Sequence, residues 1–247
     1  MHHLPFLLLL ATLGLSACVS PARQPITIPA PIIDTPSSEA PPPDAASAAR
    51  NFQRAIAEVK PIAESYCRER RPDLNCDFRI VIDPGESPYP NAYHRLDPQT
   101  GQPLIGFNSA LIMDARNPDE LAFVLGHEAG HHIAGHLSRT QTSAMAGALI
   151  LGTLTAISGG DAGMIQSAQE IGASVGARTY SQDYELEADA IGAVIAWRAG
   201  HDPMTGAAFF SRQPDPGNSF LGSHPPNQRR QQIVARTTEA LRSGQLR

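Results

Sequence analysis

The sequence predicts a mainly helical α+β fold with a small antiparallel sheet, and three observations predict it. Apolar residues recur at helical spacing after residue 44, strand-like segments gather between residues 77 and 107, and long helical patterns follow residues 117 and 181. The 247 residues show no internal repeat and are enough to bury one sizeable core. We therefore expect one folded domain over residues 44–247.

Residues 1–17 are predicted to be a signal peptide that precedes this domain. Residues 4–15 are apolar but too short to span a bilayer. They lead into Leu15-Ser16-Ala17-Cys18, which resembles the lipobox of bacterial lipoproteins. That resemblance implies a lipid on Cys18 and, because no Asp follows it, attachment to the periplasmic face of the outer membrane. The alternative is an ordinary signal peptide with an incidental cysteine.

Residues 18–43 are expected to link the lipid anchor to the domain. Eight of the 22 prolines lie between Pro21 and Pro43. A segment of this composition cannot pack a core and prefers an extended polyproline conformation. We expect it to hold the domain away from a membrane anchored at Cys18.

The domain is predicted to open with a helix that Asp44 caps and that Pro61 kinks or restarts. Its apolar positions are Phe52, Ile56, Val59 and Ala63. Cys67 and Cys76 follow closely in an exported chain, so we expect a disulfide between them, the alternative being two buried thiols.

Three strands are predicted next. Residues 77–83 alternate apolar and polar side chains and stop at Pro84-Gly85. Residues 91–96 and 104–107 flank a turn at residues 97–101. We expect these strands to pair antiparallel, with 104–107 at an edge where an extended substrate could pair.

The next helix is predicted to begin at Asn117-Pro118-Asp119-Glu120, a capping box with proline at the first helical position, and to continue through His136. It carries His127-Glu128-Ala129-Gly130-His131. Residues four apart share a helix face, so both imidazoles can bind one zinc ion, and Glu128 beside them can activate a water molecule. The same carboxyl can then protonate the leaving amine. The alternative is a polar helix face with satisfied histidines.

A third ligand must come from elsewhere in the chain. A metzincin would need Gly and His where Ala134 and Leu137 stand, so that class is excluded, and His132 and His136 are expected to be second-layer or surface groups. A later helix is predicted from an N-cap at Ser181 to Gly200. On it, Glu185 can bind zinc while Asp189, four residues on, orients a histidine ligand. Glu187 is expected to be solvated.

The motifs together resemble a family of zinc metallopeptidases that contains the CAAX prenyl endopeptidases, the heat-shock protease HtpX and the beta-barrel assembly-enhancing protease. The matching segments are His127-Glu128-x-x-His131, Tyr180-Ser181-x-x-x-Glu185-x-Glu187-Ala188-Asp189-x-x-Gly192, Gly200-His201-Asp202-Pro203, Phe209-Phe210, and Ser223-His224-Pro225-Pro226 with Arg230. The resemblance implies a zincin-type fold and one zinc ion per chain. It also implies catalytic roles for His224, which would approach the zinc or the oxyanion, and for Arg230 near the catalytic face.

Membrane-embedded members of that family carry transmembrane helices, some of them between the two zinc motifs. Here residues 143–176 are too short and rich in glycine to span. We expect a mobile helical flap over the active site, the alternative being two core helices.

The function predicted from these features is a zinc endopeptidase of the bacterial cell envelope. The resemblance implies polypeptide substrates, expected to be misfolded or stalled envelope proteins, and the net charge of −5 gives no indication of a nucleic-acid partner. Two alternatives remain: a chaperone-like assembly factor with a latent zinc site, and a purely structural zinc, which an open fourth position disfavours.

Overall fold

The computed structural model describes residues 41–85, 87–179, 181–215, 217 and 224–246. The chain divides into two compact units, Met1–Ile33 and Asp34–Arg247, and every described residue belongs to the second. The predicted signal peptide, Cys18 and most of the linker lie outside the described residues.

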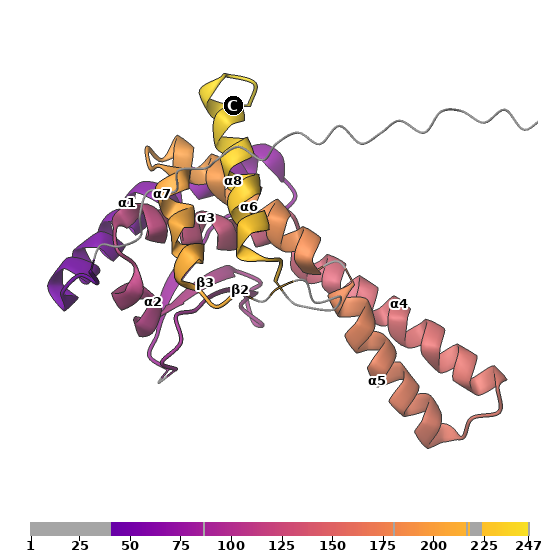
Figure 1. Ribbon diagram of the computed structural model, residues 1–247. Coiled ribbons are helices and arrows are strands. Elements are labelled where there is room, and N and C mark those ends of the chain that lie inside the picture. Colours follow the sequence, from indigo (N-terminus) through magenta and orange to yellow (C-terminus); the bar gives the residue numbers. More distant parts are fainter. Residues whose placement is uncertain (1–40, 86, 180, 216, 218–223, 247) are drawn as a thin grey trace, which may run out of the picture. The chain divides into compact units, whose positions relative to one another are not determined.

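The described residues form a mainly helical α+β fold, as the sequence predicted (Figure 1). The elements in chain order are α1 (Ala45–Arg70), β1 (Arg79–Asp83), β2 (Ala92–Leu96), β3 (Pro103–Asn108), α2 (Ser109–Asp114), α3 (Pro118–Ile133), α4 (His136–Ile157), α5 (Ala162–Arg178), α6 (Ser181–Arg198), α7 (Pro203–Ala207), the 3-10 helix η1 (Ala208–Arg212) and α8 (Asn227–Arg242).

The small sheet has the strand order β1-β3-β2 and is mixed. The predicted antiparallel pairing holds for β2 and β3, whereas β1 runs parallel to β3. All six residues of β3 are buried, which is typical of a central strand. The prediction that residues 104–107 form an edge strand is therefore wrong. Strand β3 is central, and β1 and β2 are the edge strands of the described sheet.

Helix α1 begins where the sequence predicted, because the Asp44 side chain accepts a hydrogen bond from the backbone N–H of Ser47. It does not restart at Pro61. Proline removes the hydrogen bond to the carbonyl of Ala57, but both residues are exposed, so water can satisfy that carbonyl. A disulfide joins Cys67 near the end of α1 to Cys76 before β1, as expected.

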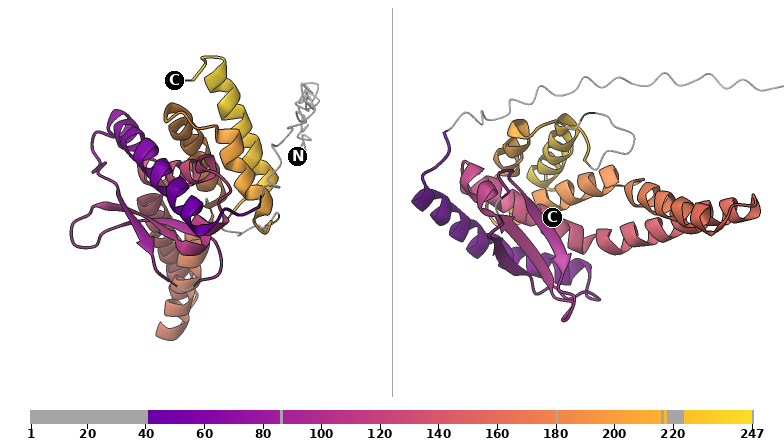
Figure 2. Two further views of the ribbon diagram at one scale, coloured as in Figure 1. Left: turned by 90° about the vertical axis from the view of Figure 1, so that its left-hand side faces the viewer. Right: turned by 90° about the horizontal axis from the view of Figure 1, so that it is seen from below.

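Helix α3 lies at the centre of the described residues, between α1 and α6, and α8 covers α6 (Figures 1 and 2). Its start follows the prediction, since the Asn117 side chain accepts from the N–H of Glu120 and Pro118 is the first helical residue. Thirteen of its sixteen residues are buried. A helix buried on nearly every side explains why polar groups on α3 must find partners inside the protein.

Helix α3 ends at Ile133 and does not continue through His136 as predicted. Gly135 adopts a left-handed conformation with φ of 69°, and a new helix, α4, starts at His136. A residue without Cβ takes this conformation at little cost, so the chain can turn here.

The predicted helix near Ser181 is α6. Ser181 is its first residue rather than the residue before it, and the Ser181 side chain donates to the carbonyl of Arg178. Gly200, with φ of 84°, ends the helix as predicted.

Residues 136–178 form two helices, α4 and α5, that pack against each other and extend away from the other helices (Figures 1 and 2). They are not core helices, because only His136 and Gly152 of α4 and Gly172 of α5 are buried. Among the described residues, α4 is long and apolar enough to cross a membrane by length and composition alone.

Candidate active site

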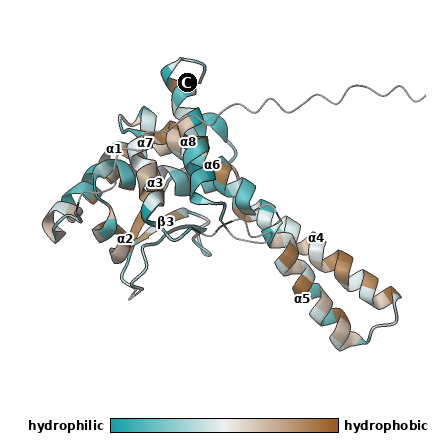
Figure 3. Cartoon of the chain, in the orientation of Figure 1, coloured by the Kyte–Doolittle hydropathy of each residue, from teal (hydrophilic) through white to brown (hydrophobic). Residues whose placement is uncertain are grey.

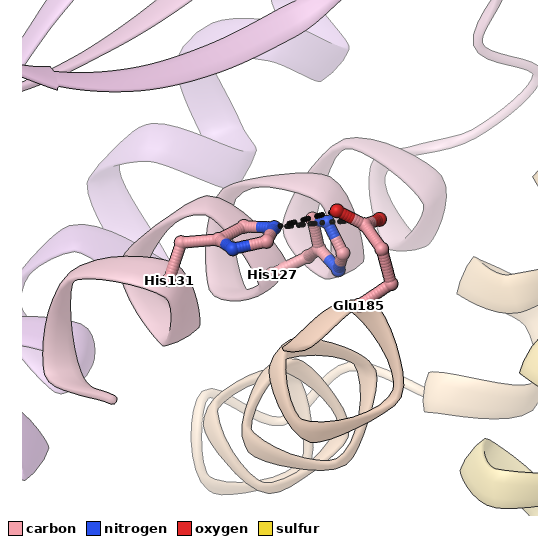
Figure 4. Close-up of side chains that lie close together, drawn as sticks. All are labelled: His127, His131 and Glu185. Carbon is pink, nitrogen blue, oxygen red and sulfur yellow. Dashed lines mark hydrogen bonds and ion pairs between the residues drawn. The ribbon is translucent and has the colours of Figure 1, made fainter. Parts of the chain in front are cut away.

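Two imidazoles and one carboxylate point toward one another between α3 and α6 (Figure 4). His127 and His131 lie one turn apart on α3, with their Nε2 atoms 3.0 Å apart. The carboxylate of Glu185 on α6 lies 3.6 Å from Nε2 of His127 and 3.3 Å from Nε2 of His131. One ligand atom from each residue lies within 4.8 Å of the others. The three ligands predicted from the sequence are therefore brought together.

The proton positions of both histidines fit a zinc ion. Asp189 accepts from Nδ1–H of His127 at 2.9 Å, which leaves the lone pair on Nε2. Nδ1 of His131 is engaged at 2.9 Å by His136, which leaves its Nε2 lone pair facing that of His127. Two lone pairs at this distance repel unless a cation lies between them, and two imidazoles with one carboxylate are typical zinc ligands.

The approach of α6 to α3 depends on two glycines, Gly126 and the Gly192 that ends the second matching segment, and the sequence did not reveal the packing role of either. A Cβ on Gly126 would lie 2.9 Å from the carbonyl oxygen of Gly192, and a Cβ on Gly192 would lie 2.8 Å from the backbone nitrogen of His127. Any larger residue would force the helices apart. The two glycines thus allow Glu185 and Asp189 to reach the histidines.

Asp189 is fully buried and connects His127 to Arg230 on α8. Arg230 donates to both Asp189 oxygens at 2.7 and 2.8 Å, and its guanidinium stacks 3.8 Å from the ring of Phe210. Burial alone would raise the pKa of Asp189, but the charge of Arg230 and the bond from His127 hold it below its usual value. The predicted role of Asp189 in orienting a histidine ligand fits this geometry. Arg230 also lies 3.5 Å from a Glu185 oxygen and lines the smaller cavity, so it contacts Glu185 directly and His127 through Asp189.

The second ligand has a positioning chain of its own. Glu187 accepts from Nε2–H of His136 at 3.1 Å, so Nδ1 of His136 accepts from Nδ1–H of His131. Arg139 donates to the same Glu187 oxygen at 2.7 Å. Glu187 is exposed as predicted, with 45% of its side chain accessible, and it also closes this chain. His136 is a buried second-layer group.

A further pair of histidines connects α3 with β2. Nε2 of His132 lies 2.8 Å from the carbonyl oxygen of Asn75, and its Nδ1 lies 3.1 Å from Nε2 of His94 on β2. Since a carbonyl only accepts, His94 donates to His132. Burial, together with the nearby charge of His132, lowers the pKa of His94 to about 3. Sequence reasoning missed His94, which no motif marks.

The charges around the ligands are strongly coupled. Burial alone would lower the pKa of His131, but the nearby carboxylates of Glu185, Glu128 and Asp189 raise it. Burial would raise the pKa of Glu185, yet the imidazoles of His131, His224 and His127 beside it hold that pKa well below its usual value. The site therefore keeps Glu185 ionised, as a metal ligand must be.

Two adjoining cavities of about 500 and 360 Å³ open onto these groups. Both are lined by Glu128, Glu185, His127 and His224. Glu128 is only 8% exposed, and His224 places its Nδ1 3.0 Å from a Glu185 oxygen. A buried carboxylate beside three candidate metal ligands in an open cavity can exchange protons with a bound water and substrate.

Comparison with known proteins agrees with this chemistry. Residues 53–238 match Peptidase family M48. Over 129 residues the chain is 33% identical to the beta-barrel assembly-enhancing protease of Yersinia pestis, which covers 48% of this chain. The match spans only 26% of that relative's length. Because the family match covers most of the chain and the ligands of a metallopeptidase meet in one site, the protein belongs to peptidase family M48 and is a metallopeptidase.

Proposed function

We propose that this protein is a zinc-dependent endopeptidase of the bacterial cell envelope that degrades misfolded or stalled envelope proteins. The observation that carries the hydrolytic part is the position of Glu128, buried in an open cavity beside His127, His131 and Glu185. The Yersinia relative is named a beta-barrel assembly-enhancing protease, and this name supports the proposed location in the cell envelope.

The chain's own residues supply the proton transfers. Zinc, when bound by His127, His131 and Glu185, polarises the substrate carbonyl and acidifies a water molecule. The Glu128 carboxylate accepts the proton of the attacking water. The resulting carboxyl then donates that proton to the nitrogen of the leaving amine.

Strand β2 offers a place for an extended substrate. Ala92, Tyr93 and His94 of β2 line the larger cavity, and β2 is an edge strand of the described sheet. A polypeptide that pairs with this edge gains main-chain hydrogen bonds irrespective of its side chains. Such pairing would bring an internal peptide bond to Glu128 and accommodate many unfolded sequences.

His224 is the residue that we expect to inhibit peptide cleavage in the free protein. Its imidazole contacts Glu185 and lines both cavities, so it occupies space that water and substrate need. We expect His224→Ala to raise the cleavage rate of an unfolded substrate such as casein. A fall in rate with metal retained would instead indicate oxyanion stabilisation, and unchanged kinetics and zinc affinity would contradict both roles.

The same contact favours a second candidate function, a chaperone-like assembly factor with a closed site. The two candidates differ in whether Glu128 matters. If envelope assembly in cells needs the protein but tolerates Glu128→Gln, the chaperone-like function is favoured.

Metal analysis combined with substitution tests the proposal. The purified wild type should hold one zinc ion per chain, and His131→Ala or Glu185→Ala should lose it because each removes a ligand. Glu128→Gln should keep the zinc and cleave casein at least about 100-fold more slowly, since only proton transfer is removed. Chelator-sensitive cleavage at the wild-type rate by Glu128→Gln would overturn the mechanism.

A further inference from the structure

Hydrophobic residues recur along both helices of the α4–α5 hairpin (Figure 3), and many of the large ones are exposed. On α4 the exposed fraction of these side chains lies between 51% and 76%, for Met145, Leu149, Ile150, Leu154 and Ile157. Met164 and Ile171 on α5 are 57% and 59% exposed. So large a continuous apolar surface is unusual for a protein that meets only water.

The hairpin is packed with small residues inside and large apolar residues outside. A Cβ on Gly147 would lie 2.1 Å from the carbonyl oxygen of Gly172, and a Cβ on Gly176 would lie 2.1 Å from that of Ser143. The two backbones therefore touch across glycines. In water, a helix pair gains most by burying its Leu, Ile and Met side chains between the helices, and here most of them face outward.

This arrangement is typical of helices that pack in lipid. Between lipid and protein no hydrophobic force drives helices together, so small residues that permit close backbone contact hold the pair and large apolar residues face the acyl chains. The 21 residues from Thr140 to Gly160 carry no charge. Helix α4 also has the length and composition of a membrane-spanning helix, while only 6% of its apolar stretch is buried.

Helix α5 limits how deeply the hairpin can enter. One side of α5 is polar and exposed, with Gln166, Ser167, Glu170 and Ser174. The apolar side carries Met164 and Ile171, which line one hollow together with Leu151 and Leu154 of α4. The hairpin therefore has one apolar face shared by both helices and one polar edge, the distribution of an element that lies in a membrane interface.

We propose that the α4–α5 hairpin binds the surface of a phospholipid bilayer by burying this apolar face at the boundary between headgroups and acyl chains. The only charged residue between Arg139 and Glu170 is Asp161. Binding is therefore driven by apolar burial and does not need anionic lipids.

The consequence for the enzyme follows from the base of the hairpin. Leu137, Thr140 and Ala144 of α4 and Ala177 of α5 line the cavity that contains Glu128. A membrane-bound hairpin would hold the catalytic cavity beside the bilayer. The lipid proposed on Cys18 fits this arrangement, because the 25 residues from 19 to 43 span at most about 80 Å and would keep the hairpin within reach of the same membrane.

The test uses residues 18–247 with Cys18→Ser, the chain without its predicted signal peptide, so that neither the apolar residues 4–15 nor a lipid anchor contributes. Flotation with vesicles of phosphatidylcholine alone should recover the protein with the vesicles. Leu154→Glu with Ile157→Glu should lower the bound fraction roughly tenfold or more, because two exposed apolar side chains are replaced by charges. The matched control, Ser167→Glu with Ser174→Glu on the polar edge, should bind like the parent.

Three outcomes would overturn the inference. The first is no flotation of the parent, and the second is equal flotation of the Leu154 and control variants. The third is a concentration-dependent dimer that Leu154→Glu with Ile157→Glu abolishes while vesicles bind neither form, which would assign the face to a second copy. Casein cleavage without vesicles should be unchanged in both variants, so the outcome is independent of the proposed proteolysis.

An environment-sensitive fluorophore gives direct evidence of insertion. Cys67 and Cys76 are joined in a disulfide, so in the Cys18→Ser chain Ile157→Cys supplies one reactive thiol. The emission of a fluorophore attached at Ile157→Cys should shift to the blue on addition of vesicles. The emission of the same fluorophore attached at Ser174→Cys should not shift. Equal emission at both positions would contradict the orientation proposed here.

Discussion

At the scale of single residues, the site is organised by what each histidine does with its second ring nitrogen. Nδ1–H of His127 donates a hydrogen bond to Asp189, and Nδ1–H of His131 donates one to His136. Both therefore present Nε2 to the metal. One partner is a buried carboxylate backed by Arg230, and the other is a neutral imidazole backed by Glu187, so the two ligands differ in basicity.

The first prediction concerns His136. Replacement by Phe removes the acceptor for Nδ1–H of His131, and zinc affinity should fall about 10- to 100-fold. His136→Asn keeps an acceptor oxygen near the same place and should restore part of that affinity. Competition with a chromophoric chelator measures both, and equal affinities of the Phe and Asn variants would indicate that His136 only fills space.

The second prediction is a pH dependence of stability. The folded pKa of His94 is about 3, below the unfolded value of 6.5. The unfolded chain thus takes up the proton first, so this contribution to stability is complete above pH 6.5 and is lost as the pH falls toward 3. For this one group the free energy of unfolding should decline by up to about 1.4 kcal/mol per pH unit below pH 6.

Denaturant unfolding of the zinc-free protein at several pH values checks it. His94→Gln cannot take up the proton, so its unfolding free energy should depend less steeply on pH between 6.5 and 4.5. Parallel pH profiles of the two proteins would show that His94 does not titrate as described.

At the scale of elements, the crossing of α3 and α6 decides whether a metal site exists. The ligands of α3 are set by local helical geometry, but Glu185 reaches them only because Gly126 and Gly192 let the backbones approach. The distance between two helices is a packing property, and it is as decisive as the ligand types.

The third prediction follows from this contact. Gly192→Ala places a Cβ against the backbone of His127, so we expect a loss of about 1–3 kcal/mol in stability and a weaker zinc site. Gly163→Ala is the control, because it adds a methyl group to an exposed position of α5 where the nearest neighbour is 3.4 Å away. If Gly192→Ala binds zinc as tightly as Gly163→Ala does, the crossing is more tolerant than we infer.

At the scale of the whole molecule, the fourth prediction concerns the tether proposed at Cys18. Wild type should sediment with the outer membrane even in high salt. Exported Cys18→Ser should detach far more readily, because only the weaker apolar contact of the hairpin remains. Fractionation of cells by density gradient measures this, and equal membrane association of the two would exclude a lipid on Cys18 as the main tether.

Several features could be predicted from the sequence because they depend on neighbours along the chain. Helix starts at Asp44 and Asn117 follow from side chains that bond within three residues, and His127 and His131 share a face because they are four residues apart. Glu185 was identified as the third ligand from chemical need and motif spacing. The disulfide pairs two cysteines only nine residues apart.

Other features arise only when distant segments pack. The central position of β3, the links from His136 to Glu187 and from His132 to His94, and the glycine contact of α3 with α6 each join residues that no local pattern relates. The sequence by itself determined the candidate metal ligands and the helices that carry them, since ligand type and helical period are local. Only the tertiary structure decided that His136 and Glu187 orient His131, and which way the α4–α5 hairpin faces its apolar side chains, because both depend on packing between elements.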